Sequence, residues 1–299
     1  MPSKDQREAL LSLLQGAEGK EWGEKMGWIH SSHNTGNSSF DEECDWYGIQ
    51  CDSTLTYVTA ISIEGSGLSA SIPSIFCTNL QTLRTIKMDR NMIYGTIPIE
   101  ITSLNELEIL SLSNNILTGT IPTFVSGSGP SKSNTQSHHL KQLMLGGNRL
   151  TGTLPNHITG SHDNYISSAI EVLELGPNRL TGTLPSTFFH GMYRLHSLDL
   201  SFNRLSGSIP SIVVLRSDIE NNDSDEYDDN ISLKHLRYLR LNDNQFVGYI
   251  PSGLARVIND EGKDVIAGQG NSLEEIWLQN NNLSGNIPVV LTELDALKQ

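Results

Sequence analysis

A stretch of eleven residues occurs almost unchanged twice in this chain, thirty positions apart. It reads LGGNRLTGTLP at 145–155 and LGPNRLTGTLP at 175–185. Repetition at a fixed spacing is the signature of a repeat architecture, which constrains the fold more than any other feature of a sequence. Six further copies are ISIEGSGLSASIP at 61–73, IKMDRNMIYGTIP at 86–98, LSLSNNILTGTIP at 110–122, LDLSFNRLSGSIP at 198–210, LRLNDNQFVGYIP at 239–251 and IWLQNNNLSGNIP at 276–288.

Every copy is preceded by an apolar residue, three positions earlier, from which the repeat can be numbered. These first positions are Val58, Leu83, Leu107, Leu140, Ile170, Leu195, Leu236 and Leu273. Their spacings are 25, 24, 33, 30, 25, 41 and 37 residues. The unit is therefore about 24 residues long, with insertions after the third, fourth, sixth and seventh copies.

The positions of the unit have mechanical meanings. Positions four and six are apolar within a short predicted strand, so they point inward and positions three, five and seven point outward. One coil cannot bury such a face alone, and we expect neighbouring coils to stack. Position nine is asparagine in seven copies, and its amide is expected to pair with the backbone of adjacent coils. Position thirteen is glycine in seven copies, which predicts room only for a very small side chain facing the core.

The unit L-x-x-L-x-L-x-x-N-x-L-x-G-x-I-P resembles the plant-type leucine-rich repeat over residues 58–290. The resemblance implies an α/β repeat solenoid, a right-handed curved array with a parallel β-sheet on its concave face and the insertions on the opposite side. Residues 58–299 are then eight repeats plus the start of a ninth at Leu297, with no C-terminal cap. Since an uncapped end is poorly soluble, we expect further sequence downstream; a ragged end that frays is the alternative.

Residues 1–57 resemble the N-terminal cap of extracellular members of this family. The segment DQREALLSLLQG predicts an amphipathic helix with Asp5 as its N-cap and Gly16 as its stop. The later segment CDWYGIQC is similar to the end of the family's cap.

That resemblance implies a disulfide between Cys44 and Cys51 that closes a short loop over the edge of the first coil, with Trp46 packed beneath it. Two reduced, buried thiols are the alternative, because cysteine count alone is weak information about the redox compartment. Cys77 is left over and is expected to be a buried free thiol.

Composition and motifs exclude several functions. The 299 residues carry 34 acidic and 20 basic side chains, a net charge of -14, which argues against a nucleic-acid partner. The sequence contains no apolar stretch long enough for a membrane span, no recognisable secretory signal, and no nucleophile elbow, phosphate loop or dinucleotide fingerprint. Histidines 138, 139, 157 and 162 and the acidic segment 217–230 lack metal-ligand spacing. We expect no enzyme activity, cofactor or metal.

The resemblance implies a non-enzymatic protein- or peptide-binding recognition module, the extracellular ligand-binding part of a receptor-like protein. A secreted inhibitor of a wall-degrading enzyme is an alternative, and the expected location is extracellular or the cell surface, with the cytoplasm as the alternative. Four Asn-x-Ser sequences are glycosylation candidates in a secreted protein. They begin at Asn37, Asn222, Asn230 and Asn282.

The outward positions of copies six to eight differ from the others and predict the ligand site. They bring together Phe202, Tyr238, Arg240 and Trp277, with Asp199, Asp243 and Glu275 around them. Aromatic residues and arginine dominate binding hot spots, so we expect a protein or peptide ligand on this concave face. The alternative is structural: Trp277 shields the last coil and Arg240 only pairs with Asp199.

A second strand is predicted over positions eleven to fifteen, with positions twelve and fourteen pointing outward. In copies one to six these positions read Ser69/Ser71, Tyr94/Thr96, Thr118/Thr120, Thr151/Thr153, Thr181/Thr183 and Ser206/Ser208. Two ranks of hydroxyls, repeated about every 4.8 Å, resemble the threonine arrays of ice-binding solenoids. Binding to ice or to a polysaccharide lattice is therefore another candidate function.

Overall fold

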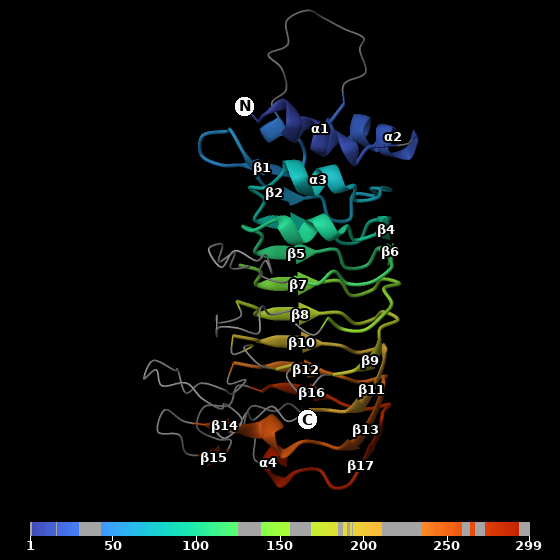
Figure 1. The fold of residues 1–299 in the computed structure, drawn as a ribbon, viewed down its shortest axis with the longest axis vertical. Helices are drawn as coiled ribbons and strands as arrows, with labels where there is room; N and C mark the ends of the chain where they lie inside the picture. Colours follow the sequence, from blue (N-terminus) through green and yellow to red (C-terminus); the bar gives the residue numbers. More distant parts are fainter. Residues whose placement is uncertain are drawn as a thin grey trace, which may run out of the picture. The chain divides into compact units, whose positions relative to one another are not determined.

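The structure, a computed structural model, describes residues 2–15, 17–29, 43–124, 139–155, 169–184, 188–189, 192, 194–210, 235–258, 264–266 and 273–292. The chain divides into two compact units, Met1–Thr151 and Gly152–Gln299. Both units are stacks of similar coils, each with a short strand on one side and a turn back on the other (Figure 1). The right-handed, curved course of the array remains a prediction, and the insertions lie largely outside the described residues.

The first unit begins with helices α1 (Lys4–Ser12) and α2 (Ala17–Lys25). The predicted N-cap at Asp5 is wrong. The N-cap of α1 is Ser3, whose hydroxyl accepts a hydrogen bond from the amide N–H of Gln6 at 3.3 Å. A serine side chain can accept a hydrogen bond from the first backbone amides of a helix as well as an aspartate can. With Ser3 as the cap, Asp5 lies in the first turn, where its negative charge interacts favourably with the helix dipole. The predicted stop, Gly16, lies outside the described residues, and α1 ends at Ser12.

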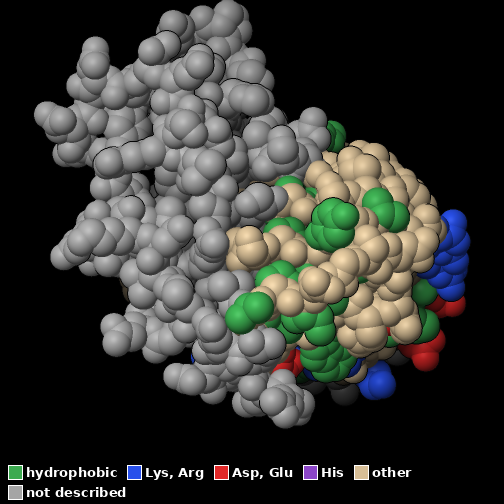
Figure 2. All heavy atoms as spheres, turned by 90° about the horizontal axis from the view of Figure 1, so that it is seen from below, with side chains coloured by type: hydrophobic (Ala, Val, Ile, Leu, Met, Phe, Trp, Pro, Cys, Tyr) green, Lys and Arg blue, Asp and Glu red, His purple; other side chains and the backbone are tan. Residues whose placement is uncertain are grey.

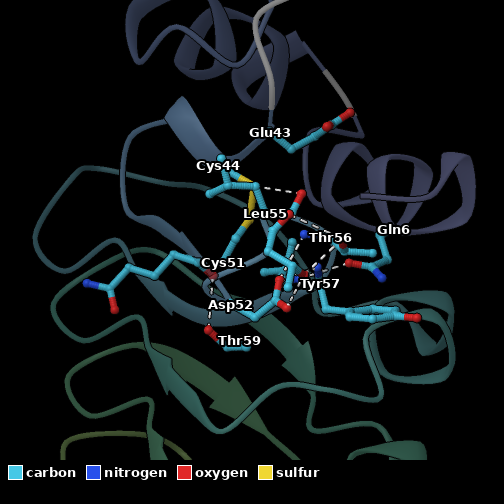
Figure 3. The surroundings of a disulfide bond; sticks show 12 residues. Gln6, Glu43, Cys44, Cys51, Asp52, Leu55, Thr56, Tyr57 and Thr59 are labelled. Carbon is cyan, nitrogen blue, oxygen red and sulfur yellow. Dashed lines mark hydrogen bonds between the residues drawn. A yellow bond between two sulfur atoms is a disulfide. The ribbon is translucent and has the colours of Figure 1, made fainter. Parts of the chain in front are cut away.

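The disulfide between Cys44 and Cys51 is present, with the two Cα atoms 5.6 Å apart (Figure 3). It links η1 (Glu43–Asp45) to β1 (Ile49–Cys51), and β1 pairs antiparallel with β2 (Val58–Ser62), the edge of the first coil. Trp46 is buried, and its ring stacks on that of Trp28 with centroids 5.2 Å apart. The cap therefore covers the first coil with a small aromatic core of its own.

The first strands of the coils form the predicted parallel sheet. In the first unit they are β2, β3 (Thr85–Lys87), β5 (Ile109–Ser111) and β7 (Gln142–Met144), and in the second β8 (Val172–Glu174), β10 (Ser197–Asp199), β12 (Tyr238–Arg240) and β16 (Glu275–Trp277). Within each unit, strands pair in chain order with the same repeat position opposite. Positions four and six are buried in copies one to seven, which places the core behind this sheet.

Shorter sheets and single turns complete the coils. The second strands are β4 (Tyr94–Thr96) and β6 (Ile116–Thr118) in the first unit, and β9 (Thr181–Thr183), β11 (Arg204–Ser208), β13 (Gln245–Tyr249) and β17 (Asn282–Ser284) in the second. The remaining elements are α3 (Ser74–Asn79), η2 (Ile99–Ser103), η4 (Ser252–Ala255), the β14 (Arg256–Ile258) and β15 (Asp264–Ile266) hairpin, and α4 (Val289–Thr292).

The asparagines at position nine do what the sequence predicts. The side-chain oxygen of Asn244 accepts from the backbone N–H of Leu205 at 3.0 Å, and its side-chain nitrogen donates to the carbonyl oxygen of Leu200 at 2.9 Å. Both partners belong to the preceding coil. Asn115 makes the equivalent bonds to Ile93 and Met88. Because buried backbone groups must be paired, each asparagine completes the hydrogen bonding of the coil before it.

The prediction for the glycines at position thirteen is only half right. These glycines need to be small, but not because they face the core. Gly207 has a backbone φ of +78°, and a Cβ atom there would lie 2.7 Å from Cγ2 of Thr183, at position fourteen of the preceding coil. Gly182 stands in the same relation to Thr153. Glycine is therefore needed for the left-handed backbone conformation and for the close approach of the threonine side chain of the preceding coil.

Neighbouring second strands are offset by two residues, which the sequence does not predict. Position fourteen of one coil lies opposite position twelve of the next, as in Thr96 opposite Thr118 and Thr153 opposite Thr181. The predicted pair of straight hydroxyl ranks is therefore wrong. The hydroxyl of Thr118 donates to the carbonyl oxygen of Gly95 in the preceding coil at 3.1 Å. Threonine or serine at position twelve thus has a structural role.

Candidate functional site

Arg240 is the centre of a cluster on the exposed face of the sheet in the second unit. The register places it directly between Asp199 on β10 and Trp277 on β16. Its guanidinium lies 3.1 Å from a carboxylate oxygen of Glu275 and 3.9 Å from one of Asp199. The guanidinium carbon also sits 5.1 Å from the ring centroid of Trp277, within cation–π range. The predicted contact between Arg240 and Asp199 is thus present, within a larger network.

A second ion pair, which the sequence analysis does not include, extends the cluster. The guanidinium of Arg237 donates from Nε to a carboxylate oxygen of Glu274 at 2.6 Å. This hydrogen bond holds the pKa of Arg237 above its ordinary value. The hydroxyl of Tyr238 donates to the other oxygen of Glu274 at 3.3 Å, and Arg237 lies over the Tyr238 ring. Arg237 and Glu274 both occupy position two, on adjacent coils. Their opposite charges are the one feature of the sequence that could have predicted this pair.

Phe202 lies at the margin of this cluster, where its backbone N–H donates to the carbonyl oxygen of Asn242 at 3.0 Å. Its ring is 51% exposed and forms no aromatic or cation–π pair with any residue that the structure describes. Its φ of +51° is in the left-handed region, which is rare for a bulky residue. Position eight adopts this conformation repeatedly, and elsewhere it is filled by residues such as Asn114, Asp243 and Asn280. An exposed phenylalanine here is therefore strained and gains little from burial.

Two polar atoms of the cluster are buried without a hydrogen-bond partner among the described residues. They are Nε of Arg240 and the side-chain oxygen of Asn242. Asn242 follows two positions after Arg240 on the same side of the sheet and is only 1% exposed. Buried polar groups are nearly always paired in folded proteins, so this donor and acceptor mark a site whose polar capacity is not used internally.

The last described coil leaves apolar surface exposed. Ile287, at position fifteen, is 67% exposed and Val289 is 69% exposed, whereas position fifteen is buried in copies one to six. Figure 2 shows hydrophobic side chains gathered on the described part of the surface viewed from below. Trp277 is 43% exposed with Arg240 packed against its ring. The structure thus shows both the exposed last coil and a contact of Trp277 with Arg240.

Several predicted sites lie outside the described residues. They are the glycosylation candidates Asn37, Asn222 and Asn230, the histidines 138, 157 and 162, and the acidic segment 217–230. Asn282 is described and exposed, on β17. Within the described ranges the structure has no group of three or more residues suited to a metal ion. It also has no helix, in those ranges, that is long and apolar enough to cross a membrane.

Comparison with known proteins identifies the repeats. The sequence matches the Leucine Rich Repeat family over residues 106–128, 139–161, 194–214, 235–257 and 272–294. A putative leucine-rich repeat receptor-like serine/threonine-protein kinase of Arabidopsis thaliana is 38% identical over 77 residues, 25% of this chain and 8% of that protein. A probable inactive receptor kinase of the same plant is 31% identical over 97 residues, 32% of this chain and 13% of the relative.

Solved structures agree with these matches. The ectodomain of the Arabidopsis thaliana receptor kinase GASSHO1/SCHENGEN3, in complex with CASPARIAN STRIP INTEGRITY FACTOR 2, has a TM-score of 0.71 at 25% identity over 99% of this chain and 29% of that one. A plant ice-binding protein has a TM-score of 0.50 at 22% identity over 96% and 89% of the chains, which shows the fold alone. The chain contains leucine-rich repeats, and its fold is similar to that of plant receptor-kinase ectodomains. It spans only a small part of the length of these kinases and of that ectodomain.

Proposed function

We propose that this chain is a non-enzymatic recognition module that binds a protein or peptide ligand through the sheet face of its second unit. The observation that carries the proposal is the cluster of Tyr238, Arg240 and Trp277, which presents exposed aromatic surface around a half-buried charge network. The Arabidopsis ectodomain of similar fold was solved in complex with CASPARIAN STRIP INTEGRITY FACTOR 2, which supports a binding function for this chain.

The cluster has the physical properties of a binding hot spot. Trp277 offers a large ring that is held in place by Arg240, so a ligand that buries it loses little side-chain freedom. The charges of Arg240, Asp199 and Glu275 are already paired with one another, which fixes their positions before binding. Preorganised groups of this kind lower the entropic cost of association. Phe202 belongs to the proposed site as an exposed residue at its margin.

We also infer an extracellular or cell-surface location for the part of the protein that this chain represents. The disulfide between Cys44 and Cys51 is stable in an oxidising compartment and rare in the cytosol. The exposed sequon at Asn282 would then be available for glycosylation. Treating the secreted protein with an endoglycosidase should shift its mobility by one glycan more than it shifts an Asn282→Gln variant; equal shifts would show that Asn282 is not glycosylated.

Selection from a displayed library of random peptides tests the binding function. Peptides recovered on the parent protein are synthesised and titrated against the variants Trp277→Ala and Tyr238→Ala. Each change is expected to weaken binding by about 2 kcal/mol, roughly thirtyfold. Met144→Ala, at position five of the first unit, is the matched control and should bind like the parent. Undiminished binding by both aromatic variants would place the site elsewhere.

Binding to an ice or polysaccharide lattice is a second candidate, favoured by one observation. The threonines Thr96, Thr153 and Thr183 at position fourteen are exposed, and no hydrogen bond of their hydroxyls occurs among the described residues. The strand offset sets each of them opposite a position-twelve residue of the next coil. Thermal hysteresis of the parent protein, lost when Thr120, Thr153 and Thr183 are replaced by leucine, is the expected result. No ice shaping by the parent protein would end this candidate.

A further inference from the structure

The sheet face of the second unit carries a large excess of negative charge. Outward positions two, three, five, seven and eight of its four coils hold six carboxylates and two guanidiniums. The carboxylates are Glu171, Glu174, Asp199, Asp243, Glu274 and Glu275, and the guanidiniums are Arg237 and Arg240. A surface of this kind attracts a positively charged partner and repels a negatively charged one.

Two of the acidic residues occupy facing positions on adjacent strands. Glu174 on β8 and Asp199 on β10 are direct partners in the parallel register. Like charges directly opposite on neighbouring strands are destabilising. Asp199 has Arg240 at 3.9 Å, but Glu174 forms no ion pair among the described residues and only accepts a hydrogen bond from the hydroxyl of Ser197 at 3.3 Å. The fold therefore keeps an uncompensated negative charge at position five.

A third carboxylate lies near the turn that follows β12. The two oxygens of Asp243 accept hydrogen bonds from the side-chain amides of Asn242 and Asn280, both at 2.7 Å. These donors are neutral, so they orient the carboxylate without cancelling its charge. In the part of the chain that the structure describes, Asp243 has no cationic partner. A ligand cation would meet a carboxylate that is already fixed in position.

Aromatic surface lies beside these carboxylates. Trp277 is 43% exposed and Phe202 is 51% exposed, and aromatic faces attract ammonium and guanidinium groups. The oxygen of Asn242, beside Asp243, is buried and has no hydrogen-bond donor among the described residues. Acceptors and aromatic faces thus dominate over donors, since the terminal nitrogens of Arg240 are paired with Asp199 and Glu275 and its unpaired Nε is buried.

We propose that the ligand of this face is an extended, basic peptide segment, one lysine or arginine of which lies between Glu174 and Asp199. This inference rests on the function proposed above, because it names the chemical class of ligand for that site. Neutral segments bind more weakly and acidic segments are excluded. The repulsion between the two carboxylates is a cost to the free protein that the bound cation removes.

The displayed peptide library described above also tests the ligand class, if its selection is run at low salt. We expect the recovered sequences to be rich in lysine and arginine. A synthetic peptide from that pool should bind Glu174→Gln about tenfold more weakly than the parent protein, and its affinity should fall as salt is added. Glu64→Gln, an acidic residue on the sheet face of the first unit paired with Arg90, is the matched control and should leave the affinity unchanged.

The melting temperature of Glu174→Gln distinguishes a binding role for Glu174 from a purely structural role. The melting temperature should rise if Glu174 serves binding and fall if its charge stabilises the fold. Glutamine at position 174 keeps an oxygen to accept from Ser197 but removes the repulsion with Asp199. The melting temperature of Glu174→Gln without peptide should therefore rise while its peptide affinity falls. A lower melting temperature would show that the charge of Glu174 stabilises the fold, and would overturn the proposal.

The remaining outcomes separate the two proposals. Recovered peptides that are neutral or acidic and lose affinity in Trp277→Ala would overturn the basic ligand and leave the binding site standing. Basic peptides that bind Glu174→Gln as well as the parent protein would also overturn the present inference. Peptides indifferent to Trp277→Ala and Tyr238→Ala, or a selection that enriches nothing, would overturn both.

Discussion

The indole N–H of Trp22, in the second helix of the cap, donates a hydrogen bond to the backbone carbonyl oxygen of Ser66 in the first coil at 3.1 Å. Ser66 stands where the other copies have asparagine, and the first coil is completed by Asn91 of the second, which accepts from the N–H of Leu68 and donates to the carbonyl oxygen of Ile63. The ring of Trp22 is 5% exposed and packs edge-on against Trp28. The cap is thus tied to the first coil by a hydrogen bond at the position that asparagine occupies in the other copies.

Replacing Trp22 by phenylalanine should test this link. The change keeps most of the buried ring but leaves the carbonyl oxygen of Ser66 without its donor, which should cost about 1–3 kcal/mol of unfolding free energy. Urea denaturation followed by tryptophan fluorescence and circular dichroism measures it. Tyr47→Phe, an exposed aromatic of the same cap, should change stability by less than about 0.5 kcal/mol. Equal effects of the two changes would contradict the assigned role.

The cysteines predict a stepwise thiol count. Burial raises the pKa of the Cys77 thiol to about 12, so it stays protonated and unreactive in the folded protein. We expect no reactive thiol in the native protein, one after denaturation, and three after denaturation with reductant. Serine at both Cys44 and Cys51 should lower stability by about 2–3 kcal/mol. Three thiols in protein that is purified and denatured without reductant would show that the disulfide between Cys44 and Cys51 does not form.

Alanine at position thirteen should cost different amounts in different coils. Gly95→Ala adds a Cβ 3.7 Å from that of Ser71 and should cost about 1 kcal/mol for the left-handed backbone alone. Gly207→Ala adds the same strain and also a contact with Cγ2 of Thr183, so it should cost more. Thr183→Ser removes that methyl group and should recover part of the loss. A double-mutant cycle measures the coupling, and zero coupling would rule out the clash.

The loop inside the cap predicts an acid-sensitive contribution to stability. The hydroxyl of Thr54 and the backbone N–H groups of Tyr57 and Thr56 lower the pKa of Asp52 from 3.8 to about 2 (Figure 3). Because the folded state binds this proton less readily than the unfolded state, its contribution is complete above about pH 4 and is lost as the pH falls toward 2. The urea midpoint of Asp52→Asn should therefore drop less than that of the parent between pH 4 and pH 2. An equal drop in the urea midpoints of Asp52→Asn and the parent would contradict this role of Asp52.

The accuracy of the sequence-based predictions follows the range of the interactions involved. Alternation along one strand decides which side chains point inward, so the core, the position of Arg240 between Asp199 and Trp277, and the asparagine bonds could be predicted. The offset between neighbouring second strands depends on backbone geometry between coils, which periodicity does not encode. The hydroxyl array was misplaced for that reason.

The site was predictable only in part. Residues in the same column could be grouped, but the diagonal contact from Arg240 to Glu275 and the pairing of Arg237 with Glu274 depend on long side chains that reach across columns. The opposition of Glu174 and Asp199 was visible in the column and carried no meaning until the register placed the two carboxylates on adjacent strands. The N-cap was misassigned because Ser3 and Asp5 are both good caps, and local sequence does not choose between them.

Each asparagine side chain bonds to the coil before it as well as to its own coil, so the pairing between coils favours changes in length by whole units. When one whole unit is duplicated or deleted, each asparagine still faces a preceding coil with the same backbone groups. The hydrogen bonds at the new junction are then the same as those at the original junction. A deletion of half a unit separates an amide such as Asn244 from the N–H of Leu205 and the carbonyl of Leu200. Variation in the number of coils among related chains is therefore expected in whole steps of about 24 residues, and length changes of other sizes are expected to collect between Pro210 and Leu236, where the spacing already varies.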